Sequence, residues 1–495
     1  MARREGEGIP ERPRRVVVAG ASGFVGRSLV EKLARDHEVV GLTRSHDLPR
    51  GTPEGTRGVR WRTADLYSLL ELEHALEGAD VAVYLVHSMS ASAELMQGDF
   101  QDFDLFLADN FARAAKTCGV RHIVYLGGLI PDARPLSKHL ASRLEVEQAL
   151  AGRGIPVTAV RASIVIGPRG SSLRIVQNLV RRLPVMVAPA WAQQPTQPVS
   201  LSDVVEALAW CVGHLDEVEG RVAEVGGADV VSYEELMWRT ARALGLRRRI
   251  LHVNVFSPRL SKLWVAQVSQ VPMALVSPLI DSLQHPMVVN DDWLQQRMGQ
   301  KPQRLDTALM DALQDARPEK LEFPLPRLPT RRDVRSLQRL PLPRGWSAED
   351  VAREYVRWLP RVFGPLLRST LSEAGVFRVY LRGFRKPLLE LAHSIDRSTL
   401  DRPLLYISGG SLARLGGRGR GRFEFRETLN GTLLASIHSF APSLPWQFYK
   451  LTQARLHLWV MKAFAARLRE LDRARTLPRQ PALPEVEEAV VPAPA

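Results

Sequence analysis

The segment LSKHLASRLEVE, residues 136–147, contains a histidine and an arginine that could do chemistry together. His139 and Arg143 are four residues apart, so a helix would place both side chains on one face. An imidazole can exchange a proton near neutral pH, whereas a guanidinium can hold a hydroxyl or phosphate oxygen but does not readily relay a proton. We therefore take His139 and Arg143 as candidate catalytic residues. The alternative is a helix that keeps them for packing or for holding a ligand.

Three glycines at a spacing of three, Gly20, Gly23 and Gly26 in GASGFVG, follow an apolar run and precede a helical pattern. A tight turn at Gly20 needs permissive backbone angles. Gly23 would let a diphosphate approach the main chain, and Gly26 would let the helix pack closely on the strand. The free N–H groups and the dipole of that helix would then hold phosphate. Between a strand and a helix, this spacing predicts a dinucleotide site, with a tight turn without ligand as the alternative.

The chain from residue 15 to residue 167 alternates short apolar runs with helical patterns such as FDLFLADNFARAAKTCG, which ends at Gly119. The apolar runs are continuous, which is typical of strands buried on both faces of a parallel sheet. They are RVVVAG, EVVGLTR, DVAVYLV, HIVYLGG and PVTAVRASIVIG. This order predicts an α/β fold with a doubly wound parallel sheet, followed by a more helical lobe.

Shifts in composition predict how the chain is organised. The first residues are charged, without the apolar segment of a secretory signal, and the last are rich in Pro and Ala; both ends are expected to be disordered. The predicted parts are a lead over 1–14, a dinucleotide-binding domain over 15–317 with its substrate lobe over about 168–317, a proline-rich linker over 318–345, an α+β domain over 346–474 and a tail over 475–495.

The predicted C-terminal domain begins with a helix and ends with a longer one. Ser347 and Asp350 form a capping-box pattern ahead of AEDVAREYVRWL. Five β-rich runs follow between 376 and 440, and a helix is expected over about 445–472. Its apolar positions are Leu456, Trp459, Val460, Ala463, Phe464, Leu468 and Leu471. This order predicts antiparallel strands with a long helix on a curved sheet.

Composition and charge limit the classes of function. The chain has 495 residues, 45% of them hydrophobic, and a formal net charge of +14. Its two cysteines exclude a disulfide framework, and no cluster suggests a metal, so we expect no metal and a cytoplasmic location. No apolar run is long enough to predict a spanning helix. The scattered arginines favour an ordinary basic surface; peripheral contact with an acidic membrane is the alternative, and no nucleic acid partner is expected.

At the glycine motif the sequence resembles the extended and atypical short-chain dehydrogenase/reductase superfamily. The resemblance covers about residues 15–300 and rests on GASGFVG, TADL, VYLVHSM, YLGGL, RASIVIGP and QPVSLSDVVEAL. Within the superfamily the chain is similar to bacterial NAD(P)-binding proteins and, more distantly, to the accessory subunit of respiratory complex I. The resemblance implies a Rossmann fold, an NAD(P) cofactor and oxidoreductase or epimerase-like chemistry on a small molecule.

The resemblance also implies which residues border the cofactor. Asp65 and Leu66 would lie beside the adenine, and residues after the later strands would line the rest of the site. The predicted cofactor-binding residues are Gly20, Ser22, Gly23, Phe24, Val25, Gly26, Arg44, Asp65, Leu66, Val86, His87, Gly127, Arg161 and Ile166.

The end of the second predicted strand, GLTRS, indicates which dinucleotide is preferred. An acidic residue there would accept hydrogen bonds from the ribose 2′-hydroxyl of NAD. This chain has Thr43, Arg44 and Ser45 instead, and Arg44 can pair with a 2′-phosphate through two parallel hydrogen bonds. We predict NADP(H), with NAD as the alternative.

The pair that enzymes of this superfamily generally use, Tyr-x-x-x-Lys on a helix, is absent. None of the eight tyrosines has a lysine four residues later. The aligned helix has His139 and Arg143, and Gly127 and Gly128 replace the usual upstream serine. Hydride transfer with His139 as proton donor is one hypothesis, and a helix that has lost catalysis is the other. The sequence therefore leaves open whether the chain is an enzyme.

Three functions stay open at this point. The first is a reductase or epimerase-like enzyme that uses NADP(H) on an apolar or quinone-like substrate. The second is a non-catalytic dinucleotide-binding scaffold or redox sensor. The third is a lipid or quinone carrier built on the C-terminal domain, whose order of elements resembles the helix-grip fold of polyketide cyclases and lipid-transfer proteins. In that fold Phe448, Trp459 and Phe464 could face a cavity or fill it.

An apolar stripe in the predicted substrate lobe has a role that the sequence does not decide. It could line an apolar substrate cleft or lie on a membrane surface, with ordinary core as the alternative. The stripe consists of Trp264, Val265, Val268, Val271, Met273, Leu275, Val276, Leu279 and Ile280.

Overall fold

A computed structural model describes residues 13–44, 58–87, 95–132, 134–253, 258–269, 273–314, 334–415, 421–429 and 431–476. The chain divides into two compact units, Met1–Leu337 and Gln338–Ala495, and each is described by itself. Most of the predicted lead, linker and tail lies outside the described residues, and so do Ser45 and Val271.

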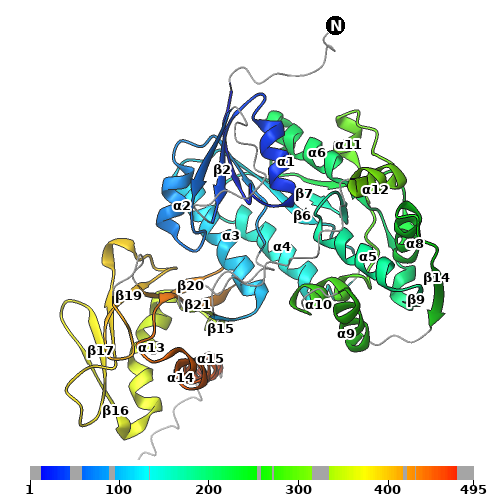
Figure 1. Cartoon of the computed structure of the whole chain (residues 1–495). Helices are drawn as coiled ribbons and strands as arrows, with labels where there is room; N and C mark the ends of the chain where they lie inside the picture. Colours follow the sequence, from blue (N-terminus) through cyan, green and yellow to red (C-terminus); the bar gives the residue numbers. More distant parts are fainter. Residues whose placement is uncertain are drawn as a thin grey trace, which may run out of the picture. The chain divides into compact units, whose positions relative to one another are not determined.

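A seven-stranded parallel sheet forms the centre of the first unit (Figure 1). Its strands, in spatial order, are β12 (Val222–Val225), β7 (Val157–Ala162), β6 (His122–Gly128), β4 (Val81–Tyr84), β1 (Arg15–Ala19), β2 (Glu38–Thr43) and β3 (Val59–Thr63). In register, Val17 of β1 lies between Val40 of β2 and Ala82 of β4. The strand order reverses at β1, and ligands of open α/β sheets bind at such a switch point.

Helices cover both faces of this sheet. On one face, α1 (Phe24–Leu33) packs against α6 (Leu201–Gly213), and on the other α2 (Leu69–Leu76), α3 (Phe100–Thr117) and α4 (Lys138–Ala151) lie side by side. The predicted doubly wound parallel sheet is therefore confirmed. The sequence analysis does not predict the edge strands β3 and β12. In β3, VRWRT, polar and apolar residues alternate, so this strand lacks the continuous apolar run that marks the central strands.

Short sheets and helices make up the lobe after β7. The strands pair as β8 (Val165–Ile166) with β11 (Val199–Ser200), β10 (Pro195–Thr196) with β13 (Val231–Ser232), and β9 (Val185–Pro189) with β14 (Arg249–Val253). The helices are α5 (Ser171–Arg182), η1 (Ala190–Gln193), α7 (Leu215–Val218), α8 (Tyr233–Ala243), α9 (Pro258–Ser269), α10 (Met273–Ser282), α11 (Trp293–Arg297) and α12 (Leu305–Gln314). Val265, Val276 and Ile280 of the apolar stripe are buried in a cluster with residues of α5 and α8. For these three residues the structure shows the core role.

An antiparallel meander and two long helices form the second unit. The strands β16 (Leu367–Leu371), β17 (Val376–Leu381), β18 (Leu389–His393), β19 (Leu404–Gly409), β20 (Arg422–Glu427) and β21 (Thr432–Phe440) are neighbours in chain order, and β15 (Val334–Pro341) follows β21 in the sheet. The start of β15 belongs to the first unit, where Val334–Ser336 pair in parallel with β5 (Leu95–Gln97). The helices are α13 (Ala348–Val362), η2 (Gly364–Leu366), η3 (Ile395–Arg397), α14 (Trp446–Leu451) and α15 (Gln453–Thr476). The Ser347 capping box is confirmed.

Two features of the second unit differ from the sequence analysis. Residues 334–341 of the predicted linker form β15, because Val334, Leu337 and Leu340 are buried and Pro341 comes only at the end of the strand, where it interrupts no ladder. The predicted single helix over about 445–472 is two helices, which are separated at Thr452.

Aromatic rings fill the space between the sheet of the second unit and its helices. The ring centroid of Tyr355 on α13 lies 5.1 Å from that of Phe464 on α15 and 5.5 Å from that of Phe425 on β20. These three side chains are at most 6% exposed. Phe464 thus fills the interior rather than facing a cavity. Phe448 and Trp459, which were expected to face or fill it, are 66% and 49% exposed.

The contact between α1 and β1 gives a test of the fold. Gly26→Ala should lower the free energy of unfolding, because a Cβ would lie 2.2 Å from the Gly20 carbonyl oxygen and 2.7 Å from Ala21 Cα. Overpacking of this kind typically costs about 1–3 kcal/mol. Urea unfolding measures this loss of stability. The control is Gly213→Ala in α6, where a Cβ meets nothing within 4 Å. Equal stability of the two variants would contradict the close packing.

Candidate functional site

The glycine-rich loop joins the end of β1 to the start of α1 at the switch point of the sheet. Gly20 has a φ of +86°, and the Gly20 carbonyl oxygen accepts a hydrogen bond from the Gly23 N–H at 2.9 Å. Gly23 is the N-cap of α1, with no side-chain cap and no acidic residue in the first turn. The N–H groups of that turn are therefore available to an anion, and the dipole favours one. The Gly20–Gly23 turn and the first turn of α1 therefore fit the diphosphate that the glycine spacing predicts.

Four further predicted residues lie in or against this loop. The Ser22 carbonyl oxygen accepts from Arg27 Nε at 3.0 Å, and Val25 packs on the core beneath the sheet. Phe24 lies over the chain after β8, because a Cβ at Gly167 or Gly170 would be 3.1 or 3.0 Å from Phe24 Cζ. Ile166, the last residue of β8, is buried beside this contact.

Arg44 and Asp65 follow β2 and β3, two neighbouring strands whose carboxyl ends share one edge of the sheet. Arg44 is exposed and has no ion pair with any described residue. Asp65, in contrast, accepts from Arg335 Nη2 at 2.6 Å, and that guanidinium lies 4.0 Å from the ring centroid of Tyr67. The carbonyl oxygen of Leu66 accepts from Asn110 Nδ2 at 2.9 Å. These contacts fix the loop predicted to border the adenine.

His139 and Arg143 both lie on α4, as their spacing predicts, but their surroundings differ. Arg143 is buried and forms an ion pair with Asp104 of α3, in which the side chains are 8% and 1% exposed. The Tyr125 hydroxyl of β6 donates to the Arg143 carbonyl oxygen at 3.3 Å. His139 is half-buried, and its ring centroid lies 6.5 Å from that of Phe100. Its Nδ1 is buried without a hydrogen-bond partner among the described residues.

Burial and the Arg143 charge together set the protonation states of this cluster. Desolvation, then Arg143, then His87 lower the pKa of His139 to about 3. Desolvation and then Arg143 also lower the pKa of His87, which follows Val86 after β4. Desolvation raises the pKa of Tyr125 to about 12. At pH 7 His139 is therefore a neutral imidazole, which can donate a hydrogen bond but carries no extra proton to give.

Asp104 and two tyrosines keep Arg143 charged despite its burial. Desolvation is the largest single effect and opposes the charge, but Asp104, Tyr125 and Tyr84 together outweigh it, and the pKa of Arg143 is raised. Arg143 Nε is buried and makes no hydrogen bond with a described residue. At the end of β6, Gly127 leaves room for the Tyr125 ring, since a Cβ there would lie 2.9 Å from Tyr125 Cε1. Arg143 and His139 Nδ1 are thus the two groups of the cluster that could meet a ligand.

Arg161 has a partner other than the predicted cofactor. Its Nε and Nη2 donate to the Glu147 carboxylate at 3.0 and 2.8 Å, a bidentate pair that ties β7 to α4. A direct contact between Arg161 and the dinucleotide stays a prediction.

Sequence reasoning missed Asp104 and Phe100, the two α3 residues that surround the catalytic candidates. A signal was present, because α3 carries Asp102, Asp104 and Asp109 within an otherwise apolar pattern, and all three are buried. Isolated buried carboxylates are costly unless they are paired. Buried aspartates in such a helix therefore indicate basic partners on a neighbouring element.

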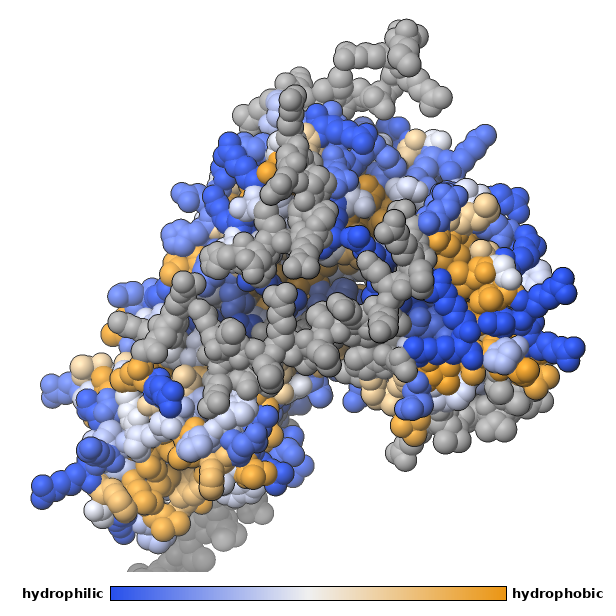
Figure 2. All heavy atoms as spheres, in the orientation of Figure 1, coloured by the Kyte–Doolittle hydropathy of each residue, from blue (hydrophilic) through white to orange (hydrophobic). Residues whose placement is uncertain are grey.

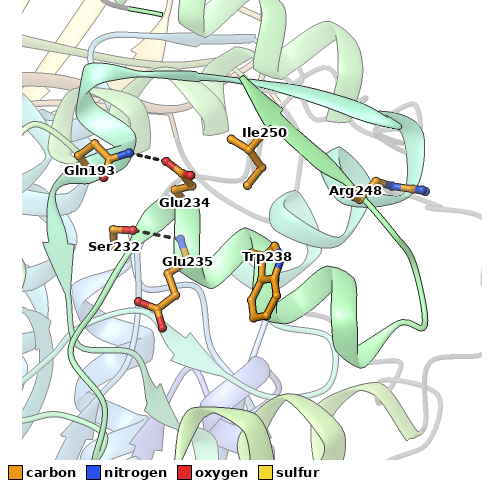
Figure 3. Close-up of a pocket in the computed structure, with 7 residues that line it drawn as sticks. All are labelled: Gln193, Ser232, Glu234, Glu235, Trp238, Arg248 and Ile250. Atoms are coloured by element: carbon orange, nitrogen blue, oxygen red, sulfur yellow. Dashed lines mark hydrogen bonds between the residues drawn. The ribbon is translucent and has the colours of Figure 1, made fainter. Parts of the chain in front are cut away.

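A pocket of about 420 Å³ lies elsewhere in the lobe (Figure 3). Its polar groups serve local structure: Glu234 accepts from Gln193, and Ser232 Oγ accepts from the Glu235 N–H at 3.0 Å. Arg248 Nε donates to the Val180 carbonyl oxygen at 2.6 Å. We therefore place the candidate site at the sheet edge and not in this pocket. Among the described residues, no cluster suited to a metal ion is found, and no helix has the length and apolar character to cross a membrane.

Comparison with known proteins adds to this geometry. A family model described as NAD(P)H-binding matches residues 20–179. The N-terminal part of the chain is an NAD(P)H-binding Rossmann domain. The matched segment contains the glycine loop, Arg44, Asp65, His139 and Arg143.

Three curated proteins are similar to parts of this chain. The auxiliary protein GraX of Staphylococcus aureus is 27% identical over 175 residues, 33% of this chain and 56% of that protein. The ceramide reductase of Caulobacter vibrioides is 26% identical over 48% of this chain and 73% of its own length. The mitochondrial NADH dehydrogenase [ubiquinone] 1 alpha subcomplex subunit 9 of Arabidopsis thaliana is 25% identical over 44% of this chain and 55% of that subunit. The distant resemblance to a complex I subunit is confirmed, and this chain matches little more than half of two of these relatives.

The buried histidine of the Rossmann domain gives a pH prediction. The pKa of His139 is about 3 in the folded protein, against 6.5 ordinarily, so as pH falls the unfolded chain binds a proton before the native protein does. Stability is therefore lost below pH 6.5, at about 1.4 kcal/mol per pH unit for such a group. His139→Gln removes this loss. Between pH 6.5 and pH 5 the wild type should lose up to about 2 kcal/mol more than the variant.

Urea unfolding at the two pH values measures this difference. The exposed His74 provides the control, because His74→Gln should leave the pH dependence as in the wild type. If wild type and His139→Gln lose the same free energy of unfolding between pH 6.5 and pH 5, the pKa of His139 is not lowered in the folded protein and the prediction is wrong.

Proposed function

We propose that the first unit is an NADPH-dependent reductase of an apolar carbonyl or quinone compound. The observation that carries the proposal is a neutral histidine whose Nδ1 has no hydrogen-bond partner among the described residues, one helical turn from a buried, charged arginine that is paired with Asp104. Both side chains stand at the start of α4, which follows β6 beyond the carboxyl edge of the sheet that carries the glycine loop.

Bound NADPH would supply the hydride, which leaves the carbonyl oxygen with a negative charge. A neutral His139 would donate a hydrogen bond to that oxygen, and the fixed positive charge of Arg143 would stabilise it as charge develops. Neither His139, with a pKa of about 3, nor Tyr125, with a pKa of about 12, supplies a proton readily at pH 7. The proton that completes the alcohol therefore comes from water.

The surroundings of His139 support an apolar substrate. Phe100 lies beside its ring, and the apolar helix α10 packs against α4, where Ser137 Oγ and Ser282 Oγ are 2.9 Å apart. The similar ceramide reductase is named for a lipid substrate, and the similar complex I subunit belongs to an enzyme named for ubiquinone. An apolar substrate suits both the local packing and these names.

The preference for NADPH is tested at Arg44. Wild type should bind NADPH more tightly than NADH, because a charge-assisted contact with the 2′-phosphate contributes roughly 1.5–3 kcal/mol. Arg44→Gln should lose most of this preference without weakening NADH binding. Calorimetric titration measures the affinities for NADPH and NADH. Arg35→Gln is the control, because Arg35 is another exposed arginine of the same domain. Equal affinities in the wild type would refute the prediction.

The role of His139 is tested by turnover. His139→Phe should lower kcat by about 10²–10³, the usual cost of removing one donor from a developing oxyanion, while NADPH affinity stays unchanged. His139→Gln keeps an N–H donor and should retain more activity. Oxidation of NADPH with a panel of quinones, ketones and enones measures this. A neutral donor also predicts a kcat without a histidine ionisation between pH 5 and pH 8; a clear inflection near 6.5 would restore the imidazolium mechanism.

The second candidate function is a non-catalytic dinucleotide-binding scaffold. It is favoured by the same cluster, in which His139 and Tyr125 both have pKa values far from neutrality. It predicts thermal stabilisation by NADPH without oxidation of NADPH on any acceptor. The carrier hypothesis is not taken further, because Phe464 and its aromatic neighbours occupy the interior of the second unit. A cytoplasmic location stays a prediction.

A further inference from the structure

A two-stranded ribbon in the first unit exposes apolar and basic side chains on one face. The strands β9 and β14 are parallel, with Val185 opposite Arg249. Val185 and Leu251 are 43% and 55% exposed, and Arg249 is exposed between them. Met186, the next residue of β9, is buried in the core instead. The ribbon therefore has one face in the core and one face, formed by Val185, Arg249 and Leu251, toward solvent.

Two further arginines join this face from the neighbouring chain. Arg181 lies in the last turn of α5, ahead of β9, and Arg247 lies two residues before β14; both are exposed. Arg248 holds the two segments together, because it donates to the carbonyl oxygens of Val180 and Arg181 at 2.6 and 3.2 Å. Arg248 thus has a structural role. In contrast, the side chains of Arg181, Arg247 and Arg249 form no ion pair or hydrogen bond with any described residue.

A tryptophan lies next to the same ribbon. Trp238 of α8 is 47% exposed and lines one pocket with Ile250, Glu234 and Glu235 (Figure 3). Ile250 points to the opposite face of β14 from Arg249 and Leu251. Figure 2 shows hydrophobic and hydrophilic atoms side by side in this part of the first unit. Trp238 therefore belongs to the other face of the ribbon, and the solvent face gathers two exposed aliphatic side chains and three arginines without an ion pair among the described residues.

We propose that this surface, formed by Arg181, Val185, Arg247, Arg249 and Leu251, docks on a bilayer that contains anionic lipid. Acidic headgroups would pair with the three arginines, and the interfacial region of the bilayer would accept the side chains of Val185 and Leu251. A nucleic acid would pair with the arginines but has no apolar layer for Val185 and Leu251. Docking is independent of the proposed reductase activity, although it would bring the protein close to lipid-soluble substrates.

The test is sedimentation of the full chain with vesicles of phosphatidylcholine and phosphatidylserine in equal parts, beside vesicles of phosphatidylcholine alone. Wild type should bind the mixed vesicles and not the neutral ones. The triple variant Arg181→Gln, Arg247→Gln, Arg249→Gln should bind about 100-fold more weakly, since each arginine near an anionic surface contributes about fivefold. Leu251→Ser should bind about tenfold more weakly, through the loss of its apolar contact.

A charge-matched control separates this surface from the general basic charge. Arg35→Gln, Lys116→Gln, Arg121→Gln removes three exposed cations elsewhere in the same unit and should bind like wild type. NADPH titration of every variant confirms that the Rossmann domain is folded, and it reports on the proposed function separately.

Three results would overturn the proposal. The first is equal loss of vesicle binding in the two triple variants, which would indicate only long-range attraction. The second is equal binding of wild type to neutral vesicles. The third is Leu251→Ser binding like wild type while single-stranded RNA competes fully for the arginine surface, which would make it a site for polyanions.

Discussion

The buried ion pair between Asp104 and Arg143 is the interaction on which the candidate site depends. It joins α3 to α4, and both side chains are almost fully shielded from water. Removing either partner would leave an uncompensated buried charge, which typically costs about 3–5 kcal/mol. Burial lowers the pKa values of both His139 and His87, and the charge of Arg143, which the pair holds in place, lowers them further. One structural pair therefore joins two helices and adds to the effect of burial that keeps the catalytic candidate neutral.

Much of the first unit could be predicted because its signals are local. RVVVA and the glycines that follow it specify a buried strand, a tight turn and a helix start, and the structure places all three there. The strands that were missed lie at sheet edges or carry weak patterns. VRWRT forms β3 through pairing with β2, and VRSLQRLP forms β15 inside a proline-rich region. The partner strand β5 of β15 is distant in the chain, whereas β3 pairs with the preceding strand β2 and was missed because its own apolar pattern is weak.

The candidate site shows the same limit more sharply. The spacing of His139 and Arg143 predicts a shared helix face, which the structure has. The spacing does not show that Arg143 would pair with Asp104, 39 residues earlier, or that Arg161 would pair with Glu147. Such partners decide which arginines are committed to structure. Arg44 is the opposite case, because it has no ion pair among the described residues and its predicted role stays open to a phosphate.

The electrostatics of the cluster also separate reduction from epimerase-like chemistry. Epimerisation through a keto intermediate requires a base that removes a hydroxyl proton and later returns it. His139, with a pKa of about 3, is a weak base, and Tyr125, with a pKa of about 12, is protonated at pH 7. Reduction of a carbonyl needs instead a hydrogen-bond donor and a fixed positive charge where the oxygen becomes negative. In the reaction we propose, His139 and Arg143 would supply both without changing protonation state, which is why we propose carbonyl reduction rather than epimerase-like chemistry.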